Sequence, residues 1–271
     1  MKRQCGFVTR PDCRLYFEAV GEGPALVFAH GLGGSHLSWW QQMPHFAARN
    51  RCVTFAHRGF GPSTAPAEGA DPQQFAEDLA ALADHLALGP LTIVAQSMGG
   101  WTAIEFALRF PGRVRGIVLS STSGTIDYTR LSPALAEPLA RWNREAAAEL
   151  ERCTRLGLHV AAGTRMAEEQ PAHHLLYQEV DETSAGLDKM LVRERLLAMR
   201  ERLPGTMRAI VAPVLVVVGE EDIVFPACVA DALAGSFPRG RAVAFRQCGH
   251  SPYFERPQAF NTTVESFVAT L

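Results

Sequence analysis

The stretch L-T-I-V-A-Q-S-M-G-G-W, residues 91–101, joins a strand pattern directly to a helix pattern. Its first five residues form a short β-rich apolar run, and residues 99–110 have a helical pattern. A serine at such a junction is lifted on a sharp, strained turn above the carboxyl end of a sheet, so the residues two before and two after it must be small. Ala95 and Gly99 meet this need, although glycine is usual at the first position. The stretch therefore predicts Ser97 as a nucleophile in an α/β protein.

Short apolar runs alternate with helical patterns on both sides of this junction. The alternation is typical of an α/β fold with a mostly parallel central sheet and flanking helices. The first two runs predict an antiparallel hairpin at a sheet edge, and the other six predict strands covered on both faces. The predicted strands are 7–9, 14–20, 25–29, 52–56, 91–95, 114–120, 214–218 and 242–246, and the predicted helices are 72–88, 99–110, 226–234 and 258–271.

Residues 125–203 differ from the rest because they have helical patterns and almost no β-rich run. Proline and glycine residues divide them into about four helices. A long helical insertion between two strands predicts a helical cap over one edge of the sheet, with residues 1–124 and 204–271 forming the α/β core. The alternative is that these helices only complete the core.

A serine hydroxyl needs a base, and the base needs a carboxylate to orient it. His250 lies directly after the last predicted strand, where ligands gather in open α/β sheets. Asp222 follows the strand before it, in V-G-E-E-D. We therefore predict a triad in the chain order Ser97, Asp222, His250. The competing residues are His30, His36 and His57 for the base and Glu220, Glu221 and Asp127 for the carboxylate.

An oxyanion that forms on the substrate needs backbone N–H donors. The glycine-rich loop H-G-L-G-G, residues 30–34, follows a predicted strand and can bring its backbone close to a ligand. We predict the N–H groups of Leu32 and Met98 as the oxyanion hole. We also predict that Gly31, Trp142 and Tyr177 contact the substrate. The loop contains neither a P-loop nor a dinucleotide-binding pattern.

These motifs together resemble the α/β-hydrolase superfamily in content and in order. The resemblance covers H-G-L-G-G, A-Q-S-M-G-G-W, F-P-G-R-V, G-E-E-D and G-H-S-P-Y-F-E-R-P, and it extends over nearly the whole chain outside the predicted cap. The chain looks most like small bacterial esterases, enol-lactonases and carbon–carbon bond hydrolases. One departure is Ala56 in A-H-R-G-F-G-P-S, where relatives have aspartate. In relatives this aspartate supports the loop, so we expect its loss to affect loop order, and we interpret His57 as structural.

The sequence predicts a serine hydrolase that acts on a small carboxylic ester or lactone through an acyl-enzyme, without metal or organic cofactor. The paired His173-His174 has no third ligand at a metal-binding spacing and is interpreted as a surface or substrate-facing feature. Two alternatives remain open. One is a hydrolase of meta-cleavage products, although Gln96 and Ser251 stand where such relatives commonly have asparagine and tryptophan. The other is a non-enzymatic small-molecule sensor, because fold alone does not settle function.

Composition excludes other partner classes. The 271 residues carry a formal net charge of −2 without a basic cluster, which argues against nucleic-acid binding. No apolar run approaches the about 18 residues of a membrane span, and no signal-peptide pattern follows the N-terminus. Six scattered cysteines favour reduced thiols and a cytoplasmic protein. We expect a monomer or homodimer whose partner is a small molecule with a carbonyl group.

Overall fold

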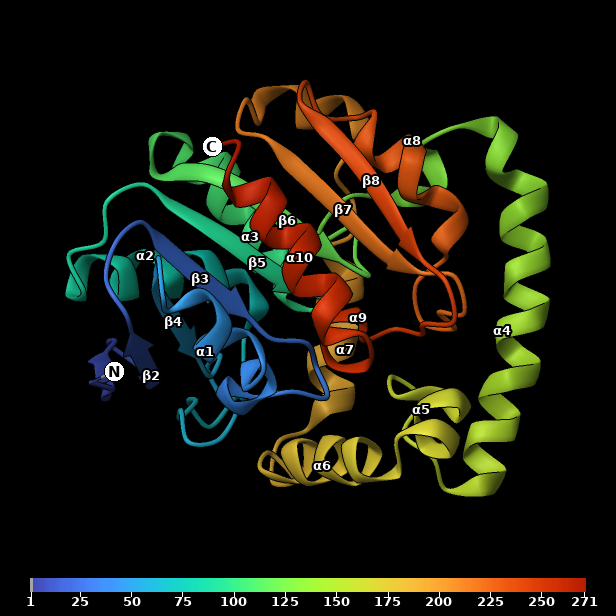
Figure 1. The fold of residues 1–271 in the computed structure, drawn as a ribbon, viewed down its shortest axis with the longest axis horizontal. Coiled ribbons are helices and arrows are strands. Elements are labelled where there is room, and N and C mark those ends of the chain that lie inside the picture. The colour runs from blue at the N-terminus through green and yellow to red at the C-terminus, as the bar shows by residue number, and fades with distance from the viewer. Residues whose placement is uncertain (1) are drawn as a thin grey trace.

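The structure, a computed structural model, describes residues 2–271 and has an eight-stranded central sheet (Figure 1). The strand order is β1-β2-β4-β3-β5-β6-β7-β8, in which β1–β2 and β2–β4 pair antiparallel and all other neighbours pair parallel. The strands are β1 Gln4–Thr9, β2 Arg14–Val20, β3 Ala25–Ala29, β4 Arg51–Phe55, β5 Leu91–Gln96, β6 Val114–Ser120, β7 Val214–Gly219 and β8 Gly240–Phe245. The predicted hairpin and parallel sheet are confirmed.

The inner strands are covered on both faces, as their apolar sequences require. Every residue of β3, β5 and β7 is buried. Side chains of β3 alternate between two apolar clusters, with Leu26 and Phe28 on one face and Val27 on the other. The expectation of two-sided burial is wrong for β8, where only Phe245 is buried, because this strand is at the sheet edge.

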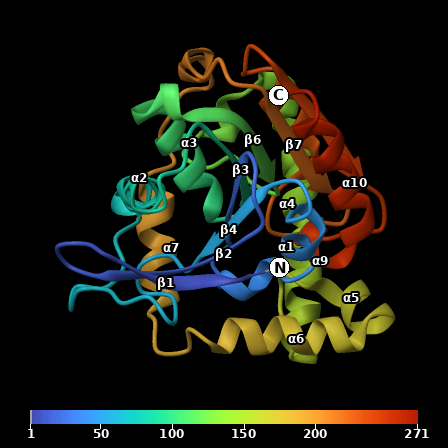
Figure 2. The same cartoon turned by 60° about the vertical axis from the view of Figure 1, so that its left-hand side comes forward.

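Helices flank the sheet on both faces (Figure 2). Residues from α2 (Phe75–His85), α3 (Gly99–Arg109) and α8 (Ala230–Ala234) pack in one apolar cluster. Residues from α1 (Gln42–Phe46), α9 (Pro252–Glu255) and α10 (Pro257–Val268) pack in the other. The predicted helix 72–88 is shorter than expected, because it begins with a 3-10 turn capped by Asp71 and ends before Ala87, whose φ is +48°.

Residues 125–203, here called the inserted segment, contain four helices between β6 and β7. These are α4 (Ala136–Leu156), α5 (Gly163–Glu169), α6 (Pro171–Glu182) and α7 (Lys189–Ala198). Helix α4 runs along one side of the molecule, and α5 and α6 lie at one end of it (Figure 1). The segment contacts the loop after β7 and helix α3, since Trp142 Nε1 donates to Asp222 O at 2.7 Å and Trp101 Nε1 donates to Leu196 O at 2.8 Å.

The helices within residues 2–271 do not include one that is both long and apolar enough to cross a bilayer.

Candidate active site

Ser97 sits on a strained turn between β5 and α3. Its φ is +48°, in the left-handed region that residues with a Cβ rarely adopt. A Cβ on Gly99 would collide with the carbonyl oxygen of Ala29, and one on Gly100 would collide with the side chain of Thr122. The small residues after Ser97 are therefore required by the close approach of α3 to the neighbouring strand. The turn leaves the Ser97 side chain partly exposed.

His250 is oriented by Asp222 in a buried pair. The imidazole Nδ1 lies 3.0 Å and 2.9 Å from the two carboxylate oxygens, and both side chains are buried. Asp222 Oδ1 also accepts from the backbone N–H groups of Val224 and Phe225, each at 2.8 Å. Because a carboxylate only accepts, the contact assigns a proton to Nδ1, and in the neutral form of the ring Nε2 is then the acceptor. This is the tautomer that a general base needs.

Ser97 and His250 line one cavity of about 470 Å³, here called the main cavity. Within residues 2–271 no hydrogen bond joins the Ser97 hydroxyl to the imidazole. Such contacts are often long without substrate and tighten when it binds. The structure thus brings the two groups to the same cavity, with His250 already held by Asp222.

The N–H groups of Leu32 and Met98 are free in the part of the chain that the structure describes, because neither donates to a backbone or side-chain acceptor. Both residues line the main cavity. Gly31 does not line it. A Cβ at that position would collide with the Gln96 side chain, so this glycine permits close packing of the loop behind the cavity. Gly33 lines the cavity in its place.

A sequence profile described as alpha/beta hydrolase fold matches residues 24–257. The chain belongs to the α/β-hydrolase family. A relative from Mycobacterium tuberculosis that carries the name of a non-heme bromoperoxidase, BpoC, is 34% identical over 95% of this chain and 98% of its own length. The 3-oxoadipate enol-lactonase 2 of Acinetobacter baylyi is 26% identical over 96% of this chain and 94% of its own. The structure of Est816, described as an N-acyl homoserine lactone degrading enzyme, has a TM-score of 0.78, 26% identity, and coverage of 97% of this chain and 100% of that one.

Two further residues of this α/β-hydrolase hold the His250 loop, and the sequence analysis missed both. Gln96 Nε2 donates to the carbonyl of His250 at 3.2 Å. Glu255 accepts from the N–H groups of Gly249 at 2.7 Å and Ser251 at 3.0 Å, on either side of the histidine. Burial raises the pKa of Glu255 to about 7. The sequence signal that could have predicted the Glu255 contact is a glutamate five residues after the histidine, at the end of a short helix.

The competing acids of the α/β-hydrolase are occupied elsewhere. Asp127 Oδ1 accepts from Thr129 N at 3.1 Å and Thr129 Oγ1 at 2.6 Å, which caps a turn at the start of the inserted segment. Glu221 forms a surface ion pair with Arg165 at 2.7 Å, and Glu220 is exposed. Asp222 is the acid that contacts His250.

The competing histidines support loops. His30 Nδ1 lies 2.8 Å from the Gly31 carbonyl, and His30 Nε2 accepts from the His57 N–H at 3.0 Å, so His30 braces the glycine loop. Burial lowers the pKa of His30 to about 3, and its ring is neutral. His57 is also buried and lies 2.8 Å from Thr102 Oγ1. His36 stacks edge-on against Tyr16. None of the three lines the main cavity.

The loop that has Ala56 in place of aspartate is held by other contacts. Ser63 Oγ donates to the Ala56 carbonyl at 2.7 Å. Arg58 is buried and forms a two-point ion pair with Asp78, with both distances 2.7 Å. These contacts explain how the loop stays ordered without the aspartate.

The inserted segment forms one wall of the main cavity. Trp142 and Tyr177 line it, as do Trp101 and Tyr128. Three other large apolar residues do not line the cavity: Trp39 is in the core, whereas Trp40 and Met190 are exposed. The sequence analysis missed the charged residues of this wall, which are His159, Asp181, Lys189, Arg193 and Arg200.

The paired histidines of α6 are bound within the inserted segment. His174 Nε2 accepts from His159 N at 3.4 Å, and His173 Nδ1 lies 2.7 Å from Gln170 Oε1. Residues 2–271 contain no group of three or more His, Cys, Asp or Glu side chains placed to hold a metal ion.

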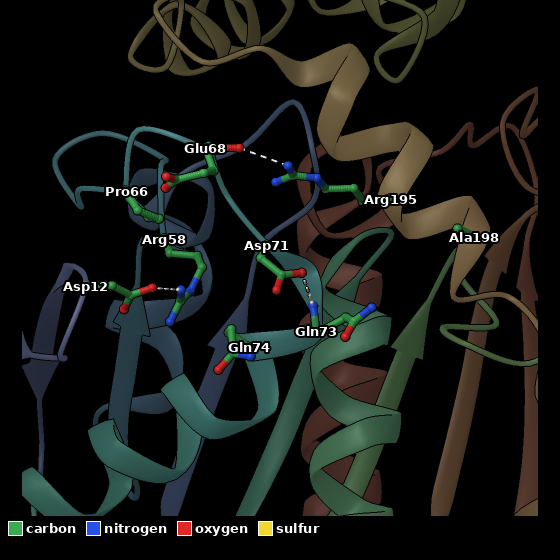
Figure 3. Close-up of a pocket in the computed structure, with 10 residues that line it drawn as sticks. Asp12, Arg58, Pro66, Glu68, Asp71, Gln73, Gln74, Arg195 and Ala198 are labelled. Atoms are coloured by element: carbon green, nitrogen blue, oxygen red, sulfur yellow. Dashed lines mark hydrogen bonds and ion pairs between the residues drawn. The ribbon is translucent and has the colours of Figure 1, made fainter.

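A second cavity of about 470 Å³ lies between the loop after β4 and α7 (Figure 3). Charged side chains that line it are bound by protein groups. Arg58 contacts Asp12 at 2.7 Å, Arg195 donates to the carbonyl of Glu68 at 2.9 Å, and Asp71 accepts from Gln73 N at 3.0 Å. Polar contacts between the core and the inserted segment therefore surround this cavity. Its lining residues, within the part of the chain that the structure describes, do not include a nucleophilic serine, threonine or cysteine.

Proposed function

We propose that this α/β-hydrolase is a serine hydrolase that acts on a small carboxylic ester or lactone. The observation that carries the proposal is the buried His250–Asp222 pair, which opens on the same cavity as a serine held at positive φ. A serine activated in this way attacks carbonyl carbon. The two free N–H groups of Leu32 and Met98 add the donors that the resulting oxyanion requires.

The proposed reaction has two halves. Ser97 Oγ attacks the carbonyl while His250 Nε2 takes its proton, and the oxyanion accepts from Leu32 and Met98. Collapse of this intermediate expels the alkoxide, which takes the proton from His250 and leaves an acyl-Ser97. Water then attacks the acyl group with His250 as base, and the acid is released. Asp222 holds the imidazole throughout, and the scheme uses no metal or organic cofactor.

We propose that the inserted segment acts as a cap that closes the main cavity and selects the substrate. Trp142 connects it to the catalytic loop, because its indole N–H donates to the Asp222 carbonyl. Tyr177 Oη lies 3.2 Å from Ser251 Oγ, directly after His250. In the same proposal the enzyme works in the cytoplasm as a monomer or homodimer, on a small molecule rather than on nucleic acid or a membrane.

Relatives favour ester or lactone chemistry over carbon–carbon cleavage. The enol-lactonase and the acyl homoserine lactone degrading enzyme both take a lactone, by their names. In this chain Gln96 binds the His250 backbone and Ser251 donates to the Ala161 carbonyl at 2.8 Å, so both positions serve to hold the loop.

The name of the bromoperoxidase relative supports a second candidate activity. If hydrogen peroxide attacks the acyl-Ser97 in place of water, the product is a peracid, which can oxidise bromide. The same serine, histidine and oxyanion donors serve this reaction. Bromination of a dye in the presence of acetate and peroxide, lost in Ser97→Ala, would support it.

A fluorophosphonate probe tests the proposed function directly. We expect wild type to be labelled at Ser97, and Ser97→Ala to be unlabelled while folded. Hydrolysis of short p-nitrophenyl esters or lactones should fall by about 10⁴-fold or more in the variant. A folded wild type that is neither labelled nor active on any ester or lactone, but binds small molecules, would favour the sensor alternative instead.

A further inference from the structure

Arg200 forms part of the main cavity and has aromatic neighbours. It lies just after the end of α7, and its guanidinium carbon is 5.0 Å from the ring centre of Trp101 and 5.1 Å from that of Tyr128. Trp101 is fixed, because its indole N–H donates to Leu196 O. The guanidinium is therefore held in place by packing against two aromatic rings.

Arg200 has no acidic partner within residues 2–271. Its Nε is buried and makes no hydrogen bond, and the side chain forms no ion pair. Arg202, two residues later, shows the usual arrangement, with Nε and Nη2 at 2.6 Å and 2.8 Å from the two oxygens of Glu105. Burial lowers the pKa of Arg200 below its ordinary value, although a guanidinium remains charged. A half-buried cation whose Nε is shielded from water without a hydrogen-bond partner is costly and favours the binding of an anion at this place.

Asp181, which lines the main cavity, is already paired with Lys189, whose Nζ lies 2.7 Å from Asp181 Oδ1. Arg193 and Arg200 also line the cavity, and neither forms an ion pair within residues 2–271. The charge of Asp127 favours the Arg200 guanidinium, but the Asp127 carboxylate caps the turn at Thr129 and forms no ion pair with Arg200. The cavity therefore has a positive end, formed by α7 and the residues after it.

We propose that this end of the main cavity binds a carboxylate of the substrate through Arg200. The proposal rests on the proposed function and adds the substrate class: a small ester or lactone that also carries a free carboxylate. The planar guanidinium matches a planar carboxylate in a two-point contact. Trp101, on which the guanidinium packs, lies on α3 only four residues after Ser97, so the carboxylate would be separated from the scissile carbonyl by a short chain of a few carbons.

The test compares a substrate with and without the negative charge. Monomethyl adipate and dimethyl adipate have the same chain, and methanol release measures their hydrolysis. We expect wild type to prefer the monoester in kcat/KM. In Arg200→Met, kcat/KM for the monoester should fall about 30-fold, while that for the diester should stay within about threefold. The same kcat/KM measurement on monomethyl succinate and monomethyl glutarate would show which chain length the enzyme prefers.

Two control variants separate charge from packing. Arg200→Lys keeps the charge without the planar fork and should recover part of the preference. Arg155→Met, on the exposed face of α4, makes the same exchange outside the cavity and should change neither substrate. An equal loss on both esters in Arg200→Met would make Arg200 a structural residue and overturn the proposal, as would a wild type without preference for the monoester.

A binding measurement keeps the two proposals distinguishable. Adipate dianion and neutral adipamide are titrated calorimetrically into Ser97→Ala and into Ser97→Ala with Arg200→Met. We expect adipate to bind about tenfold or more weakly to the double variant, with adipamide unaffected. If no ester is hydrolysed but this difference appears, the carboxylate site stands and the hydrolase proposal fails. If esters are hydrolysed and the difference is absent, the hydrolase proposal stands and the carboxylate-site proposal fails.

Discussion

The two halves of the main cavity are built in different ways. The core half, with Ser97, Leu32 and His250, comes from loops that directly follow β5, β3 and β8, and backbone hydrogen bonds and close glycine contacts hold these loops. The other half comes from helices of the inserted segment, where α4 buries only Ala146 and Cys153. In the proposed function, the loops after the strands therefore position the reacting groups, whereas side chains of the inserted segment choose the substrate. Changes in the core half should therefore affect kcat, and changes in the inserted segment should affect KM and selectivity.

The largest effect is expected at the strained turn. Ser97→Gly should lower kcat by about 10⁴-fold or more and yet unfold at a higher temperature than Ser97→Ala, because glycine adopts a φ of +48° without a Cβ clash. The gain in the free energy of unfolding should be up to about 1 kcal/mol. Thermal melts of the two inactive variants measure it. A less stable glycine variant would mean that the turn is not strained.

The next effect is the dependence of folding stability on pH that Glu255 causes. Because its folded pKa of about 7 is above the usual value of 4.5, the folded state holds this proton more tightly than the unfolded state does. Wild type should therefore lose stability as pH rises from about 4.5 to 7, by about 3 kcal/mol at most. Glu255→Gln has no such proton, so its melting temperature minus that of wild type should increase between pH 5 and pH 8.

Glu255→Gln also tests whether the core half of the cavity acts by positioning His250. Glutamine has one carbonyl oxygen for the two N–H groups beside His250, so kcat should fall while KM changes little. A KM effect without a kcat effect would contradict the separation of the two halves. Labelling of Ser97 by the fluorophosphonate at each pH serves as an independent measure of the reactivity of the site.

The smallest effect is expected in the inserted segment. Trp142→Phe keeps an aromatic ring but removes the hydrogen bond to the Asp222 carbonyl. We expect kcat/KM to fall about fivefold, mainly through KM, at a cost of about 1 kcal/mol. Leu150→Ala, also on α4 and lining the cavity, is the matched apolar control. A kcat loss as large as that of Glu255→Gln would show that the two halves are coupled through Asp222.

The difference between the two halves of the main cavity also explains which features the sequence could predict. The order of strands and helices, the turn at Ser97 and the placement of His250 and Asp222 after strands follow from local periodicity and turn residues, which depend on neighbours in sequence. The end of the helix at His85 and the exposed edge strand β8 were misjudged, because each depends on what packs against the element.

Sequence alone determined the α/β fold and narrowed the chemistry to a few serine, histidine and acidic residues. Only the tertiary structure decided that Asp222 rather than Asp127 or Glu221 meets His250, and that Glu255 holds the loop around it. It also revealed that Arg200 has no ion-pair partner within residues 2–271, whereas Arg202 nearby is paired with Glu105. The reason is physical: periodicity is a property of adjacent residues, but a hydrogen bond or ion pair depends on distances between atoms far apart in the chain.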